Sequence, residues 1–376
     1  MTFLEHLNQS DEARMIHDTA ARWAGGIADE AVRASNGFSP DRWAEMAQMG
    51  WLGILAGEDQ GGLGMGAAEA ATLAGAMGGA KLPEPFIASA VVAAGALTRL
   101  PGAATNTLLA DIAAGQVIAA PAGFGLPCDS DAPCPTATAD GDALVVTGEV
   151  ALCEAGPATG VFLLRTGGAE TCLVLLDRDA PGLEVTPYRA VDGRHLARLV
   201  LTQVRVPAGA ILGRGAGAVA ALTHAEALAV AALCADTVGT MDRALALTAA
   251  YLNEREQFGR KLASFQALRH LTADMMVEVE FARSMADLAA FGADGIEAPG
   301  ELLDRARARV CRAAKLVGET SIQLHGGMGM TDEMAIGHYF RRLIFLQAMM
   351  GQEAGALRRR AATLAEEIEL QREVAQ

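Results

Sequence analysis

The spacing of apolar residues changes twice along this chain and divides it into three parts. Up to about residue 115, apolar positions recur at helical spacing. From about 116 to 212 they fall in short β-branched runs, such as A-L-V-V-T-G and C-L-V-L-L-D, and beyond 213 the helical spacing returns. Alternation over a few residues is typical of half-buried strands, and a helical period is typical of packed helices. The pattern therefore predicts helices, then strands, then helices.

The last part of the chain reads as four long helices that are apolar around most of their circumference. Such helices are stable only when they are packed on several sides. A four-helix bundle that also meets other subunits is the simplest arrangement. The expected helices cover about 216–251, 265–292, 299–325 and 333–371, the last with a break at Gly351.

Chain length also favours several domains, because one hydrophobic core rarely serves 376 residues. We predict an α+β multidomain fold with a helical N-terminal domain, a middle β-barrel-like domain and a C-terminal four-helix bundle, over residues 1–115, 116–212 and 213–376. Ser39 and Pro40 form a helix-start signal, and the glycines from Gly50 to Met65 predict a tight connection between helices.

The composition of the chain makes some classes of binding partner improbable. A formal net charge of -15 disfavours binding to nucleic acid and to anionic membranes. The first residues have no basic segment followed by an apolar one, so we expect a cytoplasmic protein. The six cysteines lack CxxC spacing and stand singly among apolar neighbours, which predicts free buried thiols and no metal site.

Two polar and glycine-containing runs interrupt the bundle: R-E-Q-F-G-R-K-L-A-S-F-Q at Arg255–Gln266 and Q-L-H-G-G-M-G-M at Gln323–Met330. An arginine, glutamines, aromatic rings and glycine backbone together suit a phosphorylated aromatic cofactor. Each run alone is equally compatible with a surface connection between helices. The pair resembles the signature of the acyl-CoA dehydrogenase family, in which R-x-x-F-G-x-x-x-x-x-x-Q and Q-x-x-G-G-x-G contact FAD across a subunit boundary. The Gly50–Met65 stretch resembles a third segment of that family.

The resemblance implies α,β-dehydrogenation of an acyl-CoA thioester, with a glutamate removing the α-proton and FAD accepting hydride. It also implies a tetramer and an electron-transfer protein as acceptor. The residues that match the family's FAD contacts across the subunit boundary are Arg255, Gln257, Phe258, Phe265, Gln266, Gln323, Gly326 and Gly327.

The chain departs from the family at the catalytic base. Aligning G-H-Y-F-R-R-L-I-F-L-Q-A-M-M-G-Q places Arg342 where an aspartate is usual and Met350 where the glutamate is usual. A minority of the family carries its base on the first bundle helix, and the matching residue here is Ala229. Glu226 lies one turn earlier and is the candidate for a displaced base; the alternative is that it is an ordinary carboxylate on a helix face.

The middle domain departs as well. A-A-P-A-G-F-G-L-P-C-D-S-D, Ala119–Asp131, replaces the family's T-E-P-x-x-G-S-D, and T-G-E-V-A-L-C-E, Thr147–Glu154, replaces N-G-x-K-x-x-I-T. Both family segments hold the flavin ring within one subunit. Loss of this half of the site, together with the base, resembles the small subunits of heteromeric bacterial acyl-CoA dehydrogenases, such as that of pimeloyl-CoA dehydrogenase.

Three hypotheses follow. The first is a base-lacking subunit that completes the FAD site of a homologous large subunit. The second is a complete homo-oligomeric flavoenzyme that uses Glu226. The third is a flavin-free scaffold that stabilises or regulates a catalytic dehydrogenase. Flavin absorbance of the purified assembly separates the third from the others.

Overall fold

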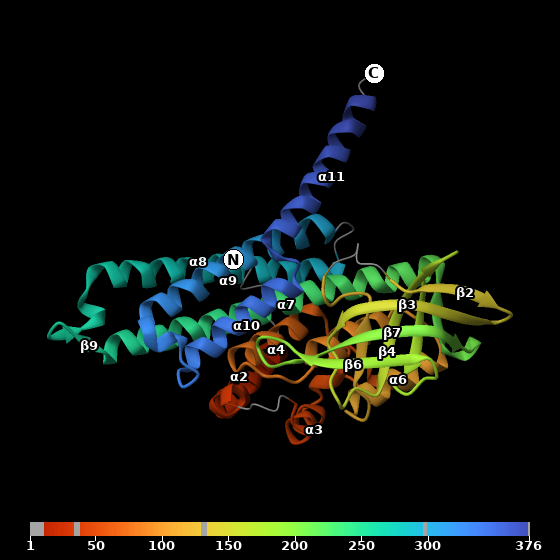
Figure 1. Ribbon diagram of the computed structural model, residues 1–376, viewed down its shortest axis with the longest axis horizontal. Helices are drawn as coiled ribbons and strands as arrows, with labels where there is room; N and C mark the ends of the chain where they lie inside the picture. Colours follow the sequence, from red (N-terminus) through yellow and green to blue (C-terminus); the bar gives the residue numbers. More distant parts are fainter. Residues whose placement is uncertain (1–10, 34–37, 129–133, 296–298, 375–376) are drawn as a thin grey trace.

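The computed structural model describes residues 11–33, 38–128, 134–295 and 299–374 (Figure 1). The N-terminal helices surround the irregular Gly50–Met65 connection, in which Gly62 is required because a Cβ there would lie 2.2 Å from the Ala56 carbonyl oxygen. The Ser39 Oγ accepts from the Arg42 backbone amide at 3.3 Å, as expected for a helix cap. The elements are α2 (Asp11–Arg33), α3 (Pro40–Gln48), η1 (Trp51–Gly53), η2 (Glu58–Gln60), α4 (Ala67–Gly79), the π-helix η3 (Ile87–Ala93), α5 (Ala94–Leu97) and α6 (Ala103–Ala113).

The middle part is an eight-stranded mixed sheet in the order β6-β7-β3-β2-β4-β5-β8, with β1 pairing β4 in parallel. The long strands β3 and β7 alternate buried and exposed residues and pair antiparallel, with register shifts at two places. The strands are β1 (Ala119–Ala122), β2 (Thr136–Asp140), β3 (Ala143–Cys153), β4 (Val161–Gly168), β5 (Cys172–Asp177), β6 (Leu183–Arg189), β7 (His195–Val206) and β8 (Ile211–Arg214), with η4 (Ala208–Ala210) before β8.

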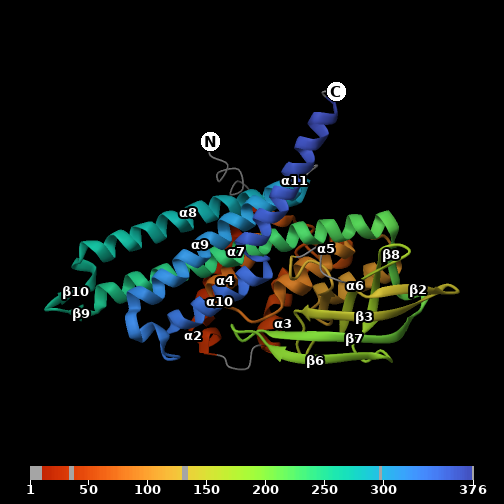
Figure 2. The same ribbon diagram turned by 45° about the horizontal axis from the view of Figure 1, so that its top comes forward.

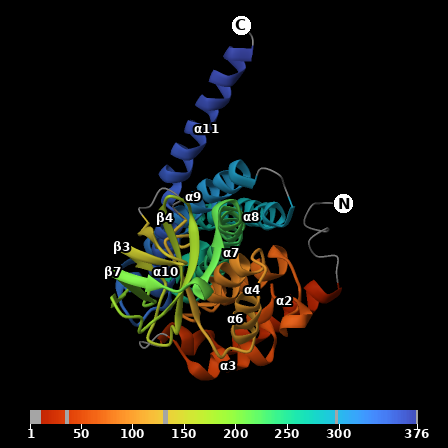
Figure 3. The same ribbon diagram turned by 90° about the vertical axis from the view of Figure 1, so that its right-hand side faces the viewer.

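The C-terminal part contains the predicted bundle. Figure 2 shows the sheet and the N-terminal helices below α7, with α8 above it. The fourth predicted helix is broken near Gly351, which adopts a φ of +77°, so its second half becomes α11 and projects from the body of the molecule (Figures 1 and 3). The elements are α7 (Gly215–Glu254), β9 (Glu256–Gln257), β10 (Arg260–Lys261), η5 (Leu262–Ser264), α8 (Gln266–Gly295), α9 (Pro299–His325), η6 (Gly326–Met330), α10 (Ala335–Met349) and α11 (Gln352–Val374).

Helix α7 is the central element of the core. By length and composition it is apolar enough to cross a membrane, with a mean hydropathy of 1.7 over its most apolar window, but 61% of that window is buried inside the fold. It packs against α4, α8, α9, α10 and the π-helix η3. Most of this apolar helix is therefore covered by other elements of the fold, although Val219 near its start stays 49% exposed.

Candidate functional site

The first signature run forms a β-hairpin at the far end of the bundle (Figures 1 and 2). Arg255 leaves the helical conformation with a ψ of 129° and ends α7, and Gln257 pairs with Arg260 across the hairpin. The two turn residues, Phe258 and Gly259, both have positive φ, +55° and +74°. This is the backbone of a two-residue hairpin turn, which matches the twist of paired strands. The turn holds the Phe258 ring outside the fold.

Aromatic and cationic side chains cluster on this hairpin. Phe258 is 91% exposed, and its ring lies 6.3 Å from that of Phe265 in an edge-on arrangement. The Arg260 guanidinium lies 3.9 Å from the centre of the Phe265 ring. An exposed ring beside arginines is costly to leave in water and suits contact with an aromatic or phosphorylated group from outside the chain.

The second signature run lies at the same end of the bundle. Helix α9 ends at His325, whose ring stacks on that of Tyr251 from α7 at 4.3 Å. The Tyr251 hydroxyl donates to the His325 carbonyl oxygen at 3.4 Å. Gly326 and Gly327 follow in exposed positions, where a Cβ would meet no atom within 4 Å. The backbone here is open to a ligand or a second chain.

All the predicted FAD-contacting residues except the half-buried Phe265 are exposed. We call this set the hairpin surface; it consists of Arg255, Gln257, Phe258, Phe265, Gln266, Gln323, Gly326 and Gly327. The surface offers a guanidinium fork, aromatic rings and open glycine backbone, and these fit one face of a dinucleotide.

The motif alignment predicts Met350 at the position of the family's base. It is fully buried at the end of α10, and its Sδ lies 3.9 Å from the Cys234 Sγ. Ala229, the alternative base position, is also fully buried. A thioether and a methyl group cannot accept a proton, so neither matching residue supplies a general base.

Glu226 also lies near the end of α10, because Arg307 both approaches its carboxylate and donates to the carbonyl oxygen of Cys128, whose amide donates to Met349. Its side chain is 30% exposed, and its carboxylate lies 3.8 Å from the Arg307 guanidinium. Burial raises the pKa of Glu226, while Arg307 and Arg359 lower it. Glu226 and Cys234 are eight residues apart on α7, which is about 12 Å along the helix axis at 1.5 Å per residue. Cys234 is the residue that contacts Met350.

The loop after β1, which replaces the segment that lies along the flavin ring, closes directly on the end of α10. The Cys128 amide donates to the Met349 carbonyl oxygen at 2.8 Å, and Arg307 donates to the Cys128 carbonyl oxygen at 3.1 Å. Phe124, Leu126 and Cys128 are each at most 6% exposed. Side chains therefore fill this junction in the described part of the loop; the last three residues of Ala119–Asp131 lie outside it.

Two departures from the family pattern, Arg342 and Glu154, belong to one buried ion network. Arg342 donates to Asp192 at 2.9 Å and also bonds Asp236. Arg194 lies 3.1 Å from Glu154 and 3.4 Å from Asp236. The network joins the sheet to α7 and α10. Sequence reasoning missed Asp192, Arg194 and Asp236, because only the tertiary fold brings them together.

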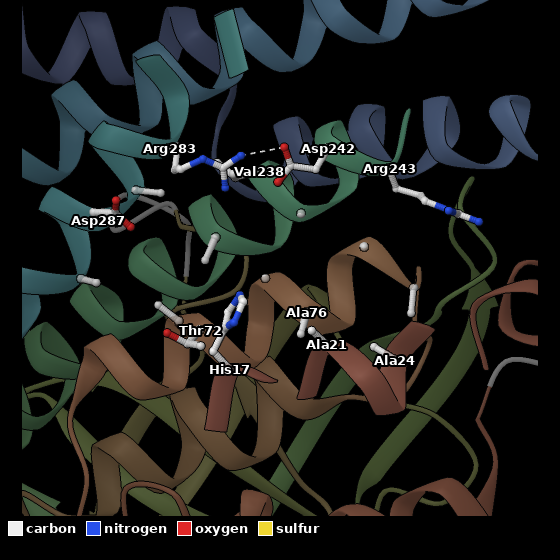
Figure 4. Close-up of a pocket in the computed structure, with 18 of the residues that line it drawn as sticks. His17, Ala21, Ala24, Thr72, Ala76, Val238, Asp242, Arg243, Arg283 and Asp287 are labelled. Carbon is white, nitrogen blue, oxygen red and sulfur yellow. Dashed lines mark hydrogen bonds and ion pairs between the residues drawn. The ribbon is translucent and has the colours of Figure 1, made fainter. Parts of the chain in front are cut away.

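A cavity of about 570 Å³ lies between α2, α4, α7 and α8 (Figure 4). None of the predicted site residues lines it. It is therefore separate from both the hairpin surface and the Met350 region.

Comparison with known proteins agrees with this architecture. The family models for the acyl-CoA dehydrogenase N-terminal and C-terminal domains match residues 10–115 and 213–365. The acyl-CoA dehydrogenase FadE34 of Mycobacterium tuberculosis is 30% identical over 370 residues, 93% of this chain and 47% of that protein. The acyl-CoA dehydrogenase IpdE2 of the same organism is 28% identical, with 88% and 91% coverage.

Solved structures extend the likeness to nearly the whole chain. The Tcur3481-Tcur3483 steroid ACAD variant has a TM-score of 0.85 and 29% identity, covering 98% of this chain and 100% of that one. The ChsE4-ChsE5 complex from Mycobacterium tuberculosis has a TM-score of 0.88 and 24% identity, with 97% and 99% coverage.

The fold and these matches define the acyl-CoA dehydrogenase architecture. The chain belongs to the acyl-CoA dehydrogenase family. It spans about half the length of the first curated relatives that it matches, 47% of FadE34 and 57% of the probable acyl-CoA dehydrogenase YngJ of Bacillus subtilis.

Proposed function

We propose that this chain is the base-lacking subunit of a heteromeric acyl-CoA dehydrogenase and that its hairpin surface completes the FAD site of a homologous large subunit. The observation that carries the proposal is the buried Met350 at the base position, 3.9 Å from Cys234. A subunit with this residue needs a partner for proton abstraction. We place the assembly in the cytoplasm, as a tetramer.

The hairpin surface has the groups that hold one half of FAD. Arg255 presents a forked donor for the pyrophosphate, and Gln257, Gln266 and Gln323 supply amide hydrogen bonds. Phe258 and Phe265 provide aromatic contact, while Gly326 and Gly327 let the backbone approach closely. FAD held there would supply the redox chemistry of the reaction, which is acceptance of hydride from the β-carbon of the acyl-CoA thioester and transfer of electrons to an electron-transfer protein.

The relatives support a two-chain arrangement. Two similar solved structures, the Tcur3481-Tcur3483 steroid ACAD and the ChsE4-ChsE5 complex, each carry a two-part name. The closed junction at Cys128 supports the same assignment, because the segment that would lie along the flavin ring contacts α10 instead. The partner would then supply most of the residues that hold the flavin ring.

Arg255→Ala tests the shared FAD site. In the assembled enzyme, loss of a charge-assisted phosphate contact should weaken FAD binding about tenfold or more, from about 1.5–3 kcal/mol. FAD per assembly is measured by absorbance after dialysis, with Arg312→Ala, an exposed arginine on α9, as the matched control. Equal flavin content in the Arg255→Ala and control assemblies contradicts the assignment.

One observation favours the second hypothesis. Burial raises the pKa of Glu226, as expected of a general base, even though Arg307 and Arg359 oppose the shift. A homo-oligomer that uses Glu226 requires the substrate to lie near Arg307. The flavin-free scaffold predicts no flavin absorbance in any assembly that contains this chain.

A further inference from the structure

The last helix, α11, packs on the body of the molecule at its start and then projects away from it (Figures 1 and 3). Near its start Arg359 donates to Asp304 of α9 at 3.0 Å, and Arg360 lies 2.9 Å from Glu301. Between residues 361 and 369, every residue whose exposure the structure describes is exposed. Most of the surface of this part of the helix is therefore open to a second chain.

An apolar seam runs along the side of α11 that faces away from α9. Leu357, Leu364 and Ile368 are 54%, 40% and 49% exposed, and Ala361 between them is also exposed. We call these four residues the α11 seam. Their spacing of four, three and four residues is that of the core positions of a coiled coil. At about 100° per residue they form one stripe, on the side opposite Arg359. Apolar side chains lined up in water favour a second apolar surface that covers them.

The α11 seam is self-complementary when two helices run antiparallel. If the two-fold axis passes between residues 362 and 363, Leu357 of one copy lies opposite Ile368 of the other. Ala361 lies opposite Leu364 in the same way, so every layer contains a large side chain. A parallel pair would instead set Ala361 against Ala361 and leave a gap in the seam, which is destabilising. The order of large and small residues therefore favours the antiparallel pair.

The charges along α11 favour the same orientation. Residues 358–360 are three arginines, and three of the four residues 366–369 are glutamates. Antiparallel packing sets the basic run of one helix beside the acidic run of the other, whereas parallel packing sets like charges together. Arg358 and Glu369 are both exposed and, at about 100° per residue, flank the seam on the same edge. In the antiparallel pair these two residues of different copies lie beside each other.

We propose that α11 pairs antiparallel with α11 of a second copy of this chain through the α11 seam, and so joins two copies within one assembly. Four layers make a short coiled coil, so the pairing is reversible. The hairpin surface lies at one end of the bundle, and α11 leaves the body elsewhere (Figures 1 and 2). The pairing therefore does not depend on whether this chain completes a partner's FAD site.

Leu364→Lys tests the seam in the full-length chain. Sedimentation equilibrium over a range of protein concentrations gives the dissociation constant for the pairing of two copies. Leu364→Lys should raise this constant about 100-fold or more, because both copies lose a buried leucine and two ammonium groups enter the seam. Ala362→Lys adds the same charge at an exposed position of α11 outside the seam. This matched control should change the constant by less than about threefold.

A charge exchange tests the predicted pair of Arg358 and Glu369. Glu369→Arg places an arginine beside Arg358 of the second copy and should raise the dissociation constant about threefold to tenfold. The double variant Arg358→Glu, Glu369→Arg restores opposite charges across the pair. Its dissociation constant should return to that of the parent.

Engineered cysteines test the antiparallel register. After mild oxidation, the double variant Leu357→Cys, Ile368→Cys should form disulfide-linked pairs of chains, because the two positions lie opposite each other between copies. Leu357→Cys alone should not, since the two copies of this position would lie about 16 Å apart along the helix axis at about 1.5 Å per residue.

Three results would overturn the proposal: a full-length chain with no pairing that Leu364→Lys weakens, a charge exchange that fails to restore pairing, and a Leu357→Cys variant that cross-links as readily as the double variant. If Leu364→Lys releases a co-expressed large subunit but leaves two copies of this chain together, the seam holds that subunit, and the proposal is equally wrong.

Discussion

Replacing Arg342 by methionine should strongly destabilise the fold, because it removes one of the two guanidinium groups that balance the buried carboxylates of the ion network. Arg342 is 1% exposed, lies 2.9 Å from Asp192 and also bonds Asp236. Methionine fills much of the same volume, but each of the two carboxylates loses one cationic partner. Breaking a buried ion pair on one side costs about 3–5 kcal/mol.

Because Arg194 remains in the variant, the expected loss in free energy of unfolding is near the lower limit of that range. It lies 3.4 Å from Asp236 and 3.7 Å from Asp192, so both carboxylates retain one cation. A loss of about 3 kcal/mol corresponds to a fall of about 1 M in the urea midpoint, for a denaturant slope near 3 kcal/mol per M. Urea unfolding followed by fluorescence measures this shift.

The adjacent arginine is the matched control. Arg341 pairs with Asp332 at 3.1 Å, but their side chains are 34% and 85% exposed. Exposed pairs contribute about 0–1 kcal/mol, so Arg341→Met should shift the midpoint by less than a third as much. Equal shifts for the two variants would refute the idea that the buried network stabilises the junction.

Two further predictions concern stability. Gly125→Ala should lower the free energy of unfolding by about 1–3 kcal/mol more than Gly141→Ala does. Both glycines have positive φ, but only a Cβ at Gly125 would lie 2.5 Å from Val92. Equal denaturation midpoints for the two variants would contradict the close packing of this loop. For Asp287 the folded pKa of about 6 exceeds the unfolded value, so its contribution to stability is present below about pH 4 and is lost as pH rises through about 6. The Asp287→Asn variant is neutral at every pH, so it should be more stable than the parent at pH 8 by up to about 2 kcal/mol and equally stable near pH 4. Thermal unfolding of both proteins between these pH values measures the difference. A stability difference that does not change with pH would contradict the pKa shift.

Local patterns predicted the elements of this fold well. The expected third bundle helix, 299–325, agrees with α9, and the predicted break at Gly351 separates α10 from α11. Both depend on short-range signals: apolar period, a glycine at a positive φ and flanking polar residues. The family resemblance likewise depended on contiguous motifs, and the comparisons confirm it.

Contacts between distant segments could not be predicted from the sequence. Arg342 stood out only as a departure from the family, and its role depends on Asp236, which lies 106 residues earlier. The packing of Met350 on Cys234 spans 116 residues in the same way. The cavity that contains Asp287 is formed by four helices, and no local pattern shows which residues surround an empty space. The roles of the hairpin surface and of Glu226 stay predictions.

The most direct test of the proposed function is the turnover of the assembled, flavin-bound enzyme that carries Glu226→Gln in this chain. The Met350 position and the Arg307 contact of Glu226 predict activity close to that of the parent, because the partner supplies the base. Loss of a general base would instead lower turnover by about 100-fold to 10,000-fold. A loss of that size, with FAD content unchanged, would make this chain the catalytic subunit and would contradict the proposal.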